Sequence, residues 1–197
     1  MVKIGLDNLI GTVAVIVIFI SLFSIGIQTT GMVTDSSSVV NITIIPTVIL
    51  NFSINHISFG EGSVDTGSDN ATLDTLGNII NGNWTPVSQG FVLNNLGNTP
   101  VTLNLKTGRN ASEFLGGTNP SYKYNVTDNG TGSCTAASVP LGAWIDVNQT
   151  GEGDFICAPL GFIIGANSVN IDLRLVIPSD ARVGFSSDIF TATGTSV

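Results

Sequence analysis

Charged residues are scarce in this sequence. Lys, Arg, Asp and Glu together make up 10% of its 197 residues, where ordinary soluble proteins have about 25%. Only six of them are basic, and these six are scattered along the chain, which leaves a formal net charge of −8. A protein that binds nucleic acid needs a basic face to neutralise phosphates. The sequence therefore predicts that nucleic acid is not a partner.

Histidine is nearly absent as well, which limits the chemistry available to the chain. Its one histidine, His56, lies in a strand-like run, and the sequence places no serine or cysteine constellation around it. Nucleophilic and general-base catalysis needs such groups within hydrogen-bond reach of one another. No pair of carboxylates stands out as a hydrolytic pair either. We therefore expect a protein that is not an enzyme and that has no cofactor, apart from the calcium candidate described below.

The two cysteines are too few to form a structural metal cage. Cys134 and Cys157 enclose 22 residues. In an oxidising compartment a disulfide between them would stabilise the fold by roughly 3 kcal/mol in the chain-entropy model. The alternative is two buried thiols. We expect the disulfide if the protein is exported.

Uncharged residues take the place of the missing charges. Hydrophobic residues make up 43% of the chain, and Gly, Ser, Thr and Asn supply most of the polar part. Disordered chains combine low hydrophobicity with high net charge, so this composition is not that of a disordered chain. It is typical of short strands with uncharged polar faces.

Asn-X-Ser/Thr sequences occur eight times, where chance would give about four in a chain of this composition. In "VVNITII" and "VILNFSIN" the asparagine alternates with apolar residues, so in a strand it would point away from the core. We expect a glycosylated protein that is secreted or exposed at the cell surface. The candidate acceptors are Asn41, Asn51, Asn70, Asn83, Asn110, Asn125, Asn129 and Asn148.

The longest apolar run, "LIGTVAVIVIFISLFSIGI", spans Leu9–Ile27 without a charge. As a helix, its 19 residues would be roughly 28 Å long, which is about the thickness of a bilayer core. Lys3 precedes the run and no basic residue closely follows it, which favours a helix with its N-terminus inside. A cleaved signal peptide and a retained anchor are both open interpretations, although no Ala-x-Ala cleavage site follows.

A third interpretation comes from the stretch "KIGLDNLIGTVAVIVIFI". It resembles the N-termini of archaeal type IV pilins and archaellins, which share a short basic leader, a small residue and a long apolar helix with an Ile-Gly-Thr opening, here Ile10–Thr12. The resemblance covers about 30 residues. It implies that a dedicated peptidase cuts between Gly5 and Leu6. It also implies that the helices of many copies pack together inside a filament.

The chain divides into a hydrophobic N-terminal helix (residues 1–30), a linker (31–38) and a β domain (39–197). About eight short strands separated by turn-rich segments, with no helical periodicity after the linker, are typical of a β-sandwich. The predicted fold class is all-β: an Ig-like antiparallel β-sandwich preceded by a long hydrophobic N-terminal α-helix. The sequence of the closing strands resembles that of many secreted Ig-like domains, a similarity of architecture that implies no activity.

Strands are expected at "VVNITIIP" and "TVILNFSINHISF", and a short one at Ile79–Ile80. Three hairpins are also expected from alternating runs that flank turn residues. The first joins Phe91–Asn94 to Val101–Lys106, and the second joins "AWIDV" to "DFICA" around "NQTGEG". The third joins Asn170–Ile177 to a last strand at Phe185–Thr193.

The loop "DVNQTGEGD" has the spacing of a calcium-binding loop, with oxygen side chains at positions 1, 3, 5 and 9 and a glycine at position 6. The candidate ligands are Asp146, Asn148, Thr150 and Asp154. Position 12, where a bidentate Glu would complete the site, is Cys157. The alternative is a polar loop without an ion.

Two further groups of residues have ordinary explanations. The acidic stretch "EGSVDTGSDNATLD" is interpreted as a solvated loop rather than a cation site. Its carboxylates are Glu61, Asp65, Asp69 and Asp74. Trp84 and Trp144 are interpreted as core or sheet-face aromatics rather than as platforms for sugars.

The sequence as a whole predicts a structural subunit of an extracellular, archaeal pilus-like filament. Its main partner would be further copies of itself, with the membrane before assembly and possible cell-envelope components as others. One alternative is a membrane-anchored surface module that binds the envelope or mediates adhesion. Another is a fibre in which a terminal strand such as Phe185–Thr193 completes a neighbour's sheet. A secreted enzyme is the remaining alternative.

Overall fold

The computed structural model describes residues 39–136 and 139–197. The predictions for Gly5 and Leu6, for the apolar run Leu9–Ile27 and for the linker 31–38 lie outside these residues. Ile44–Val197 form one compact unit. Within the described ranges, no helix has the length and apolar character needed to cross a bilayer.

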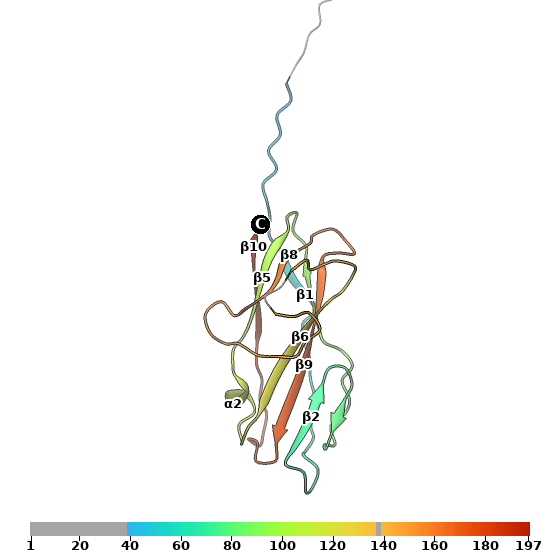
Figure 1. Ribbon diagram of the computed structural model, residues 1–197, viewed down its shortest axis with the longest axis vertical. Coiled ribbons are helices and arrows are strands. Elements are labelled where there is room, and N and C mark those ends of the chain that lie inside the picture. The colour runs from blue at the N-terminus through green and yellow to red at the C-terminus, as the bar shows by residue number, and fades with distance from the viewer. Residues whose placement is uncertain (1–38, 137–138) are drawn as a thin grey trace, which may run out of the picture. The chain divides into compact units, whose positions relative to one another are not determined.

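The described chain is mostly β, and every strand pair is antiparallel (Figure 1). The prediction of an all-β antiparallel fold is confirmed at this level. The elements in order are β1 (Leu50–Ile54), β2 (Asn70–Asp74), β3 (Ile79–Ile80), β4 (Phe91–Asn95), β5 (Val101–Thr107), α2 (Ala111–Phe114), β6 (Ser121–Asp128), β7 (Ile145–Asp146), β8 (Asp154–Leu160), β9 (Ser168–Pro178) and β10 (Phe190–Ser196).

The central strand of the larger sheet is β9, which is 11 residues long. One of its edges pairs with β6 from Val169 to Val176, and the other edge is divided between β4 and β2. Strand β1 extends the sheet beyond β4, β3 beyond β2, and β7 beyond β6. Figure 1 shows β9 running beside β6 and β2. The apolar residues that the sequence shows in β9 lie in the core, because Ile171, Leu173 and Leu175 are all buried, although Asp172 between them is buried as well.

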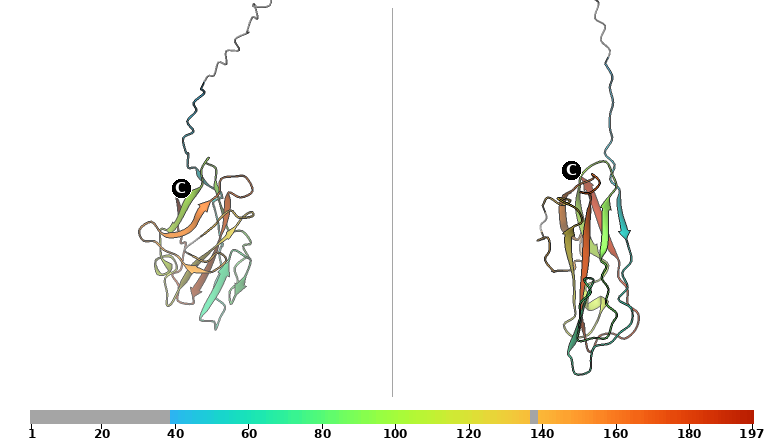
Figure 2. Two further views of the ribbon diagram at one scale, coloured as in Figure 1. Left: turned by 45° about the horizontal axis from the view of Figure 1, so that its top comes forward. Right: turned by 90° about the vertical axis from the view of Figure 1, so that its right-hand side faces the viewer.

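The smaller sheet has the order β10-β5-β8. Its central strand β5 buries Val101, Leu103 and Leu105, while the residues between them are half-buried. These side chains and those of the larger sheet form a single hydrophobic core, to which Ile156 and Leu160 of β8 also belong. Figure 2 shows the strands from two further directions.

All three predicted hairpins are wrong in their pairing. Strand β4 pairs with β1 and β9, whereas β5 pairs with β10 and β8. In the same way β7 and β8, and β9 and β10, belong to different sheets. Alternating apolar residues show only that each strand has one buried face. Two such strands can cover the same core from opposite sheets, and the intervening turn then crosses between the sheets instead of closing a hairpin.

Three local expectations also fail. Residues 40–44 form no strand, and the first strand begins only at Leu50. The last strand begins at Phe190, and the side chain of Phe185 is 96% exposed. A one-turn helix, α2, interrupts the strands although the sequence shows no helical periodicity there. The short strand predicted at Ile79–Ile80 is present as β3.

Candidate functional site

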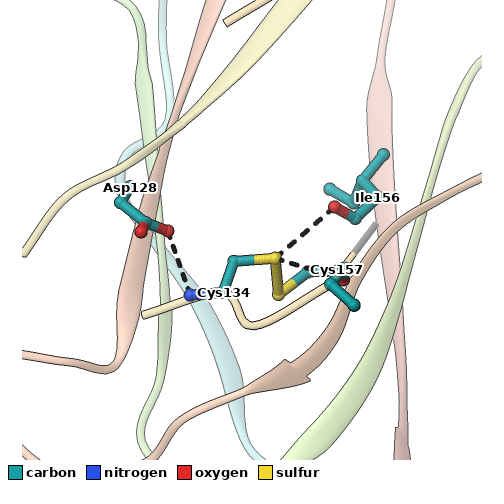
Figure 3. Close-up of a disulfide and its surroundings, with 5 residues drawn as sticks. Asp128, Cys134, Ile156 and Cys157 are labelled. Carbon is teal, nitrogen blue, oxygen red and sulfur yellow. Dashed lines mark hydrogen bonds between the residues drawn. A yellow bond between two sulfur atoms is a disulfide. The ribbon is translucent and has the colours of Figure 1, made fainter. Parts of the chain in front are cut away.

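Cys134 and Cys157 are joined by a disulfide in the structure, with their Cα atoms 5.5 Å apart (Figure 3). Both residues are buried, and Cys157 lies in β8. The backbone N–H of Cys134 donates to Oδ1 of Asp128 at 3.0 Å, which ties the bridge to the end of β6. Next to the bridge, the N–H of Ala158 donates to the carbonyl of Ala136 at 2.6 Å. The segment around Cys134 therefore covers the outer edge of β8.

The candidate glycan acceptors fall into two groups. Five of the eight asparagines have exposed side chains on the described surface. These are Asn41, Asn51, Asn70, Asn83 and Asn129. Asn51 lies in β1 between the half-buried Leu50 and Phe52, as the alternation predicts. A sugar at these positions would meet solvent rather than core.

The other three acceptors are hydrogen-bonded or buried. Asn110 is the N-cap of α2, because its Oδ1 accepts from the N–H of Glu113 at 2.9 Å while Glu113 Oε2 accepts from the N–H of Asn110 at 3.2 Å. Asn125 is only 7% exposed in β6. Nδ2 of Asn148 donates to Asp154 Oδ1 at 3.1 Å. A glycan on Asn125 would need space that the folded domain does not provide.

The four oxygen-bearing residues of the predicted calcium loop are bonded to protein groups. Oδ1 of Asn148 accepts from both the N–H and the hydroxyl of Thr150, at 2.9 and 2.8 Å. Asp154 accepts from Asn148 and from the hydroxyl of Tyr124, the latter at 2.7 Å. Asp146 forms an ion pair with Lys123 at 3.1 Å.

These contacts give the polar side chains of the loop hydrogen-bond or ion-pair partners within the protein. Burial and the neighbouring carboxylate of Asp154 raise the pKa of Tyr124, so its hydroxyl keeps the proton that it donates. In the described part of the chain no group of three His, Cys, Asp or Glu residues is arranged to hold a metal ion. Calcium in this loop, with Asn and Thr among its ligands, stays a prediction.

Sequence reasoning missed a polar network around Asp74, which was interpreted as part of a solvated loop. Its side chain is 1% exposed and lies 3.2 Å from Nη2 of Arg174. The same carboxylate accepts from the N–H groups of Leu76 and Asn78 and from the Asn78 amide. Cζ of Arg174 lies 4.1 Å from the centroid of the Trp144 ring. The signal in the sequence is the Asp-x-x-x-Asn spacing of a turn after a strand.

The remaining candidates from the sequence are a tryptophan, the histidine and exposed acidic residues. Trp84 packs over Gly62 and Gly82, where its ring occupies the space that a side chain would need. Trp84 is half-buried and lies outside the strands, and its role as a structural aromatic rather than a sugar platform stays a prediction. His56, like Glu61 and Asp65, is exposed.

Exposed apolar side chains are the most prominent unexplained feature of the described surface. One group is the segment 39–45, which we call the apolar arm. Its exposed fractions are Val39 84%, Val40 89%, Ile42 83%, Ile44 76% and Ile45 75%. Others are Val183 and Phe185 in the loop between β9 and β10, and Ile164 in the loop between β8 and β9. Contiguous exposed apolar groups are typical of association sites, and the arm has five such side chains within seven residues.

Strand β10 has an open outer edge. It pairs with β5 on one side, and no other described strand pairs with it. Its first residue is held in the core, because the Phe190 ring contacts the rings of Phe91 and Tyr122 with centroid distances of 5.3 and 6.0 Å. The last strand thus completes the sheet of its own chain, and the structure does not show it free for exchange.

Comparisons with protein-family models, with curated proteins and with solved structures found no match.

Proposed function

We propose that this protein is a structural subunit of an extracellular pilus-like filament. The filament polymerises through the apolar N-terminal helix and carries the β domain on its outside. The observation that carries the proposal is the union of two features in one chain. These are a 19-residue run without charge, at Leu9–Ile27, and a folded β unit, Ile44–Val197, with a disulfide.

The apolar run supplies the driving force for assembly. A helix that is apolar on every face is stable only in a membrane or among other apolar helices. In a filament interior, the helices of neighbouring copies would bury one another's surface at about 25 cal/mol per Å². The membrane holds the subunit before assembly, and the resemblance to archaeal pilins implies a cut between Gly5 and Leu6.

The β domain has the properties that suit an outer layer. Its disulfide and its five exposed acceptor asparagines favour an oxidising, extracellular location. Each unpaired charge buried between neighbouring copies would cost several kcal/mol. Because the chain has few charged residues, few of them would lose contact with water when copies pack side by side. We assign the two antiparallel sheets to an Ig-like sandwich.

The test is the N-terminus of the mature protein together with microscopy of sheared cell-surface material from the native source. We expect mass spectrometry to find a chain that begins at Leu6 and negative staining to show filaments. A chain that begins at Met1, without filaments, would identify a membrane-anchored surface module instead. A chain that begins beyond Ile27 would contradict the proposal.

A pair of variants sharpens this test. Gly5→Ile places a bulky residue at the proposed cut and should leave an uncut membrane protein and no filaments. Ile4→Val changes the neighbouring position conservatively and should be processed normally. Normal filaments from the Gly5→Ile chain would show that the cut lies elsewhere.

A further inference from the structure

The outer edge of β10 differs from those of the other outermost strands, β1, β3, β7 and β8. Strands β3 and β7 have only two residues each. The outer edge of β8 is covered by the segment around Cys134. Strand β1 has an irregular register between Phe52 and Ile54. A bulge of this kind protects an edge from pairing.

Strand β10 has no such protection. Its seven residues pair with β5 in an unbroken register. The sequence "FTATGTS" contains no charge, no proline and no glycan acceptor. A long, regular and uncharged edge strand is a template for another strand.

The backbone groups available on this edge can be identified. The N–H of Gly108 donates to the carbonyl of Ile189, and the N–H of Val197 donates to the carbonyl of Pro100. Hydrogen-bonded and non-hydrogen-bonded pairs alternate in an antiparallel ladder. The odd-numbered residues of β10 therefore bond to β5. The N–H and C=O groups that point away from the sheet belong to Phe190, Ala192, Gly194 and Ser196.

The apolar arm has the properties of a strand without a partner. Its sequence "VVNITII" has seven residues, as β10 has, and no charge. Apolar Val40, Ile42 and Ile44 alternate with Asn41 and Thr43, which is the period of a strand with one buried face. All of its large side chains are at least 75% exposed. The arm therefore has a strand pattern with no core to cover.

The side chains of β10 match this pattern. Phe190, Ala192 and Gly194 are half-buried, whereas Thr191 and the other threonines are exposed. Leu50 and Val48 lie against Gly194 at the same side of the domain and are half-buried themselves. A strand added here could direct its apolar residues toward these groups and its polar residues outward.

We propose that the apolar arm of one copy adds as a strand to the outer edge of β10 in a second copy. This contact deepens the proposed filament function and rests on it, because the filament is what brings copies together. Backbone hydrogen bonds supply the affinity and the alternating side chains supply the register. Asn41 remains on the outward face, where a glycan is accommodated.

The chain offers one variant for each half of the contact. Ala192→Pro removes an N–H that points outward and leaves the bonds from β10 to β5 intact, which is the setting in which a strand tolerates proline. Ala192→Ser keeps the N–H and is its control. Ile42→Lys places a charge in the middle of the arm without touching the folded core. Ile42→Val is its control.

The experiment uses the full-length chain in dodecyl maltoside, a detergent that covers the apolar run Leu9–Ile27 of each chain in its own micelle. Light scattering after gel filtration gives the number of chains per particle. Wild type and both control variants should form particles of at least two chains, whereas Ala192→Pro and Ile42→Lys should each contain one. Near-ultraviolet circular dichroism of each variant establishes that its β domain is folded.

Mixing the two defective variants is the decisive step. The Ala192→Pro chain has an unchanged apolar arm, and the Ile42→Lys chain has an unchanged β10 edge. Together they should therefore form a 1:1 complex with twice the mass of either protein. Wild type with one chain per micelle would overturn the proposal, and if filaments are present on cells the filament function would still stand. Oligomers of unchanged size in both single variants would overturn it equally.

Discussion

Asp74 and Arg174 face each other across the β2–β9 pair, with Oδ2 of the carboxylate 3.2 Å from Nη2 of the guanidinium. The two residues are 100 positions apart in the chain. The guanidinium of Arg174 also lies over the ring of Trp144. This contact joins the turn after β2 to the central strand of the larger sheet.

Acid should weaken the domain through Asp74. Burial raises the pKa of this carboxyl, but hydrogen bonds from Asn78, Arg174 and Leu76 outweigh it and hold the pKa below its ordinary value. The unfolded chain therefore binds the proton first. The stabilisation is complete above about pH 4 and is lost as the pH falls through the lower, folded-state pKa. Urea unfolding between pH 7 and pH 2 measures this loss.

The matched variant is Asp74→Asn. It should lower the free energy of unfolding at pH 7 by about 1–3 kcal/mol, because hydrogen bonds to a charged group are lost. It should also flatten the acid dependence. The exposed Asp65→Asn serves as control and should change neither quantity. An Asp74→Asn domain with wild-type acid sensitivity would contradict this role.

Loss of the disulfide should destabilise the domain without abolishing its fold. The double variant Cys134→Ala with Cys157→Ala should lower the free energy of unfolding by about 3 kcal/mol, since the open chain gains conformational freedom when unfolded. Guanidinium unfolding with and without reductant measures the same difference in the wild type. If reductant also lowered the free energy of unfolding of the double variant, the effect of reductant on the wild type could not be assigned to the disulfide.

Truncation of Leu103 tests the position of the core. This side chain is fully buried in β5, so Leu103→Ala should cost about 3–5 kcal/mol through lost burial and the cavity left behind. Ile42→Ala removes a similar side chain from the exposed arm and should cost almost nothing. Thermal unfolding of both variants gives the comparison.

Burial should decide which acceptors carry glycans. We expect native protein to carry them at exposed positions such as Asn70 and Asn129 and not at Asn125. Mass spectrometry of glycopeptides measures the occupancy of each site. A fully occupied Asn125 would mean that modification precedes folding and that β6 is displaced from its position here.

Several strands could be predicted from the sequence because a half-buried strand shows an alternating pattern, whereas β2 was missed because it lies in the stretch interpreted as a solvated loop. Strands β5 and β9 follow this pattern closely, and even the two-residue β3 was found. The pairing could not be predicted, because the pattern is the same whether neighbouring strands join one sheet or face each other across the core. The register of β9 with β6 and β2 depends on residues about 50 and 100 positions away in the chain.

The sites show the same limit. The spacing of Asp146, Asn148, Thr150 and Asp154 predicts a common ion, but spacing does not reveal that Asp146 also contacts Lys123 and that Asp154 also contacts Tyr124. In "VVNITII" a strand pattern is present without a strand. An alternating segment forms a strand only when it pairs with the edge of another strand, and within the described residues this segment has no such pairing.

Where the chain enters and leaves the domain determines how tension reaches it. Nδ2 of Asn98 donates to the carbonyl of Ile45, and the last residue, Val197, is bonded to Pro100 in the same loop. A force applied to the chain before Ile45 acts first on this loop and on the hydrogen bonds that join Thr47 and Ile49 to it. Force would reach the hydrophobic core only after these hydrogen bonds had broken. A stretched subunit would therefore detach the segment before Ile45 from the loop while its core stays folded.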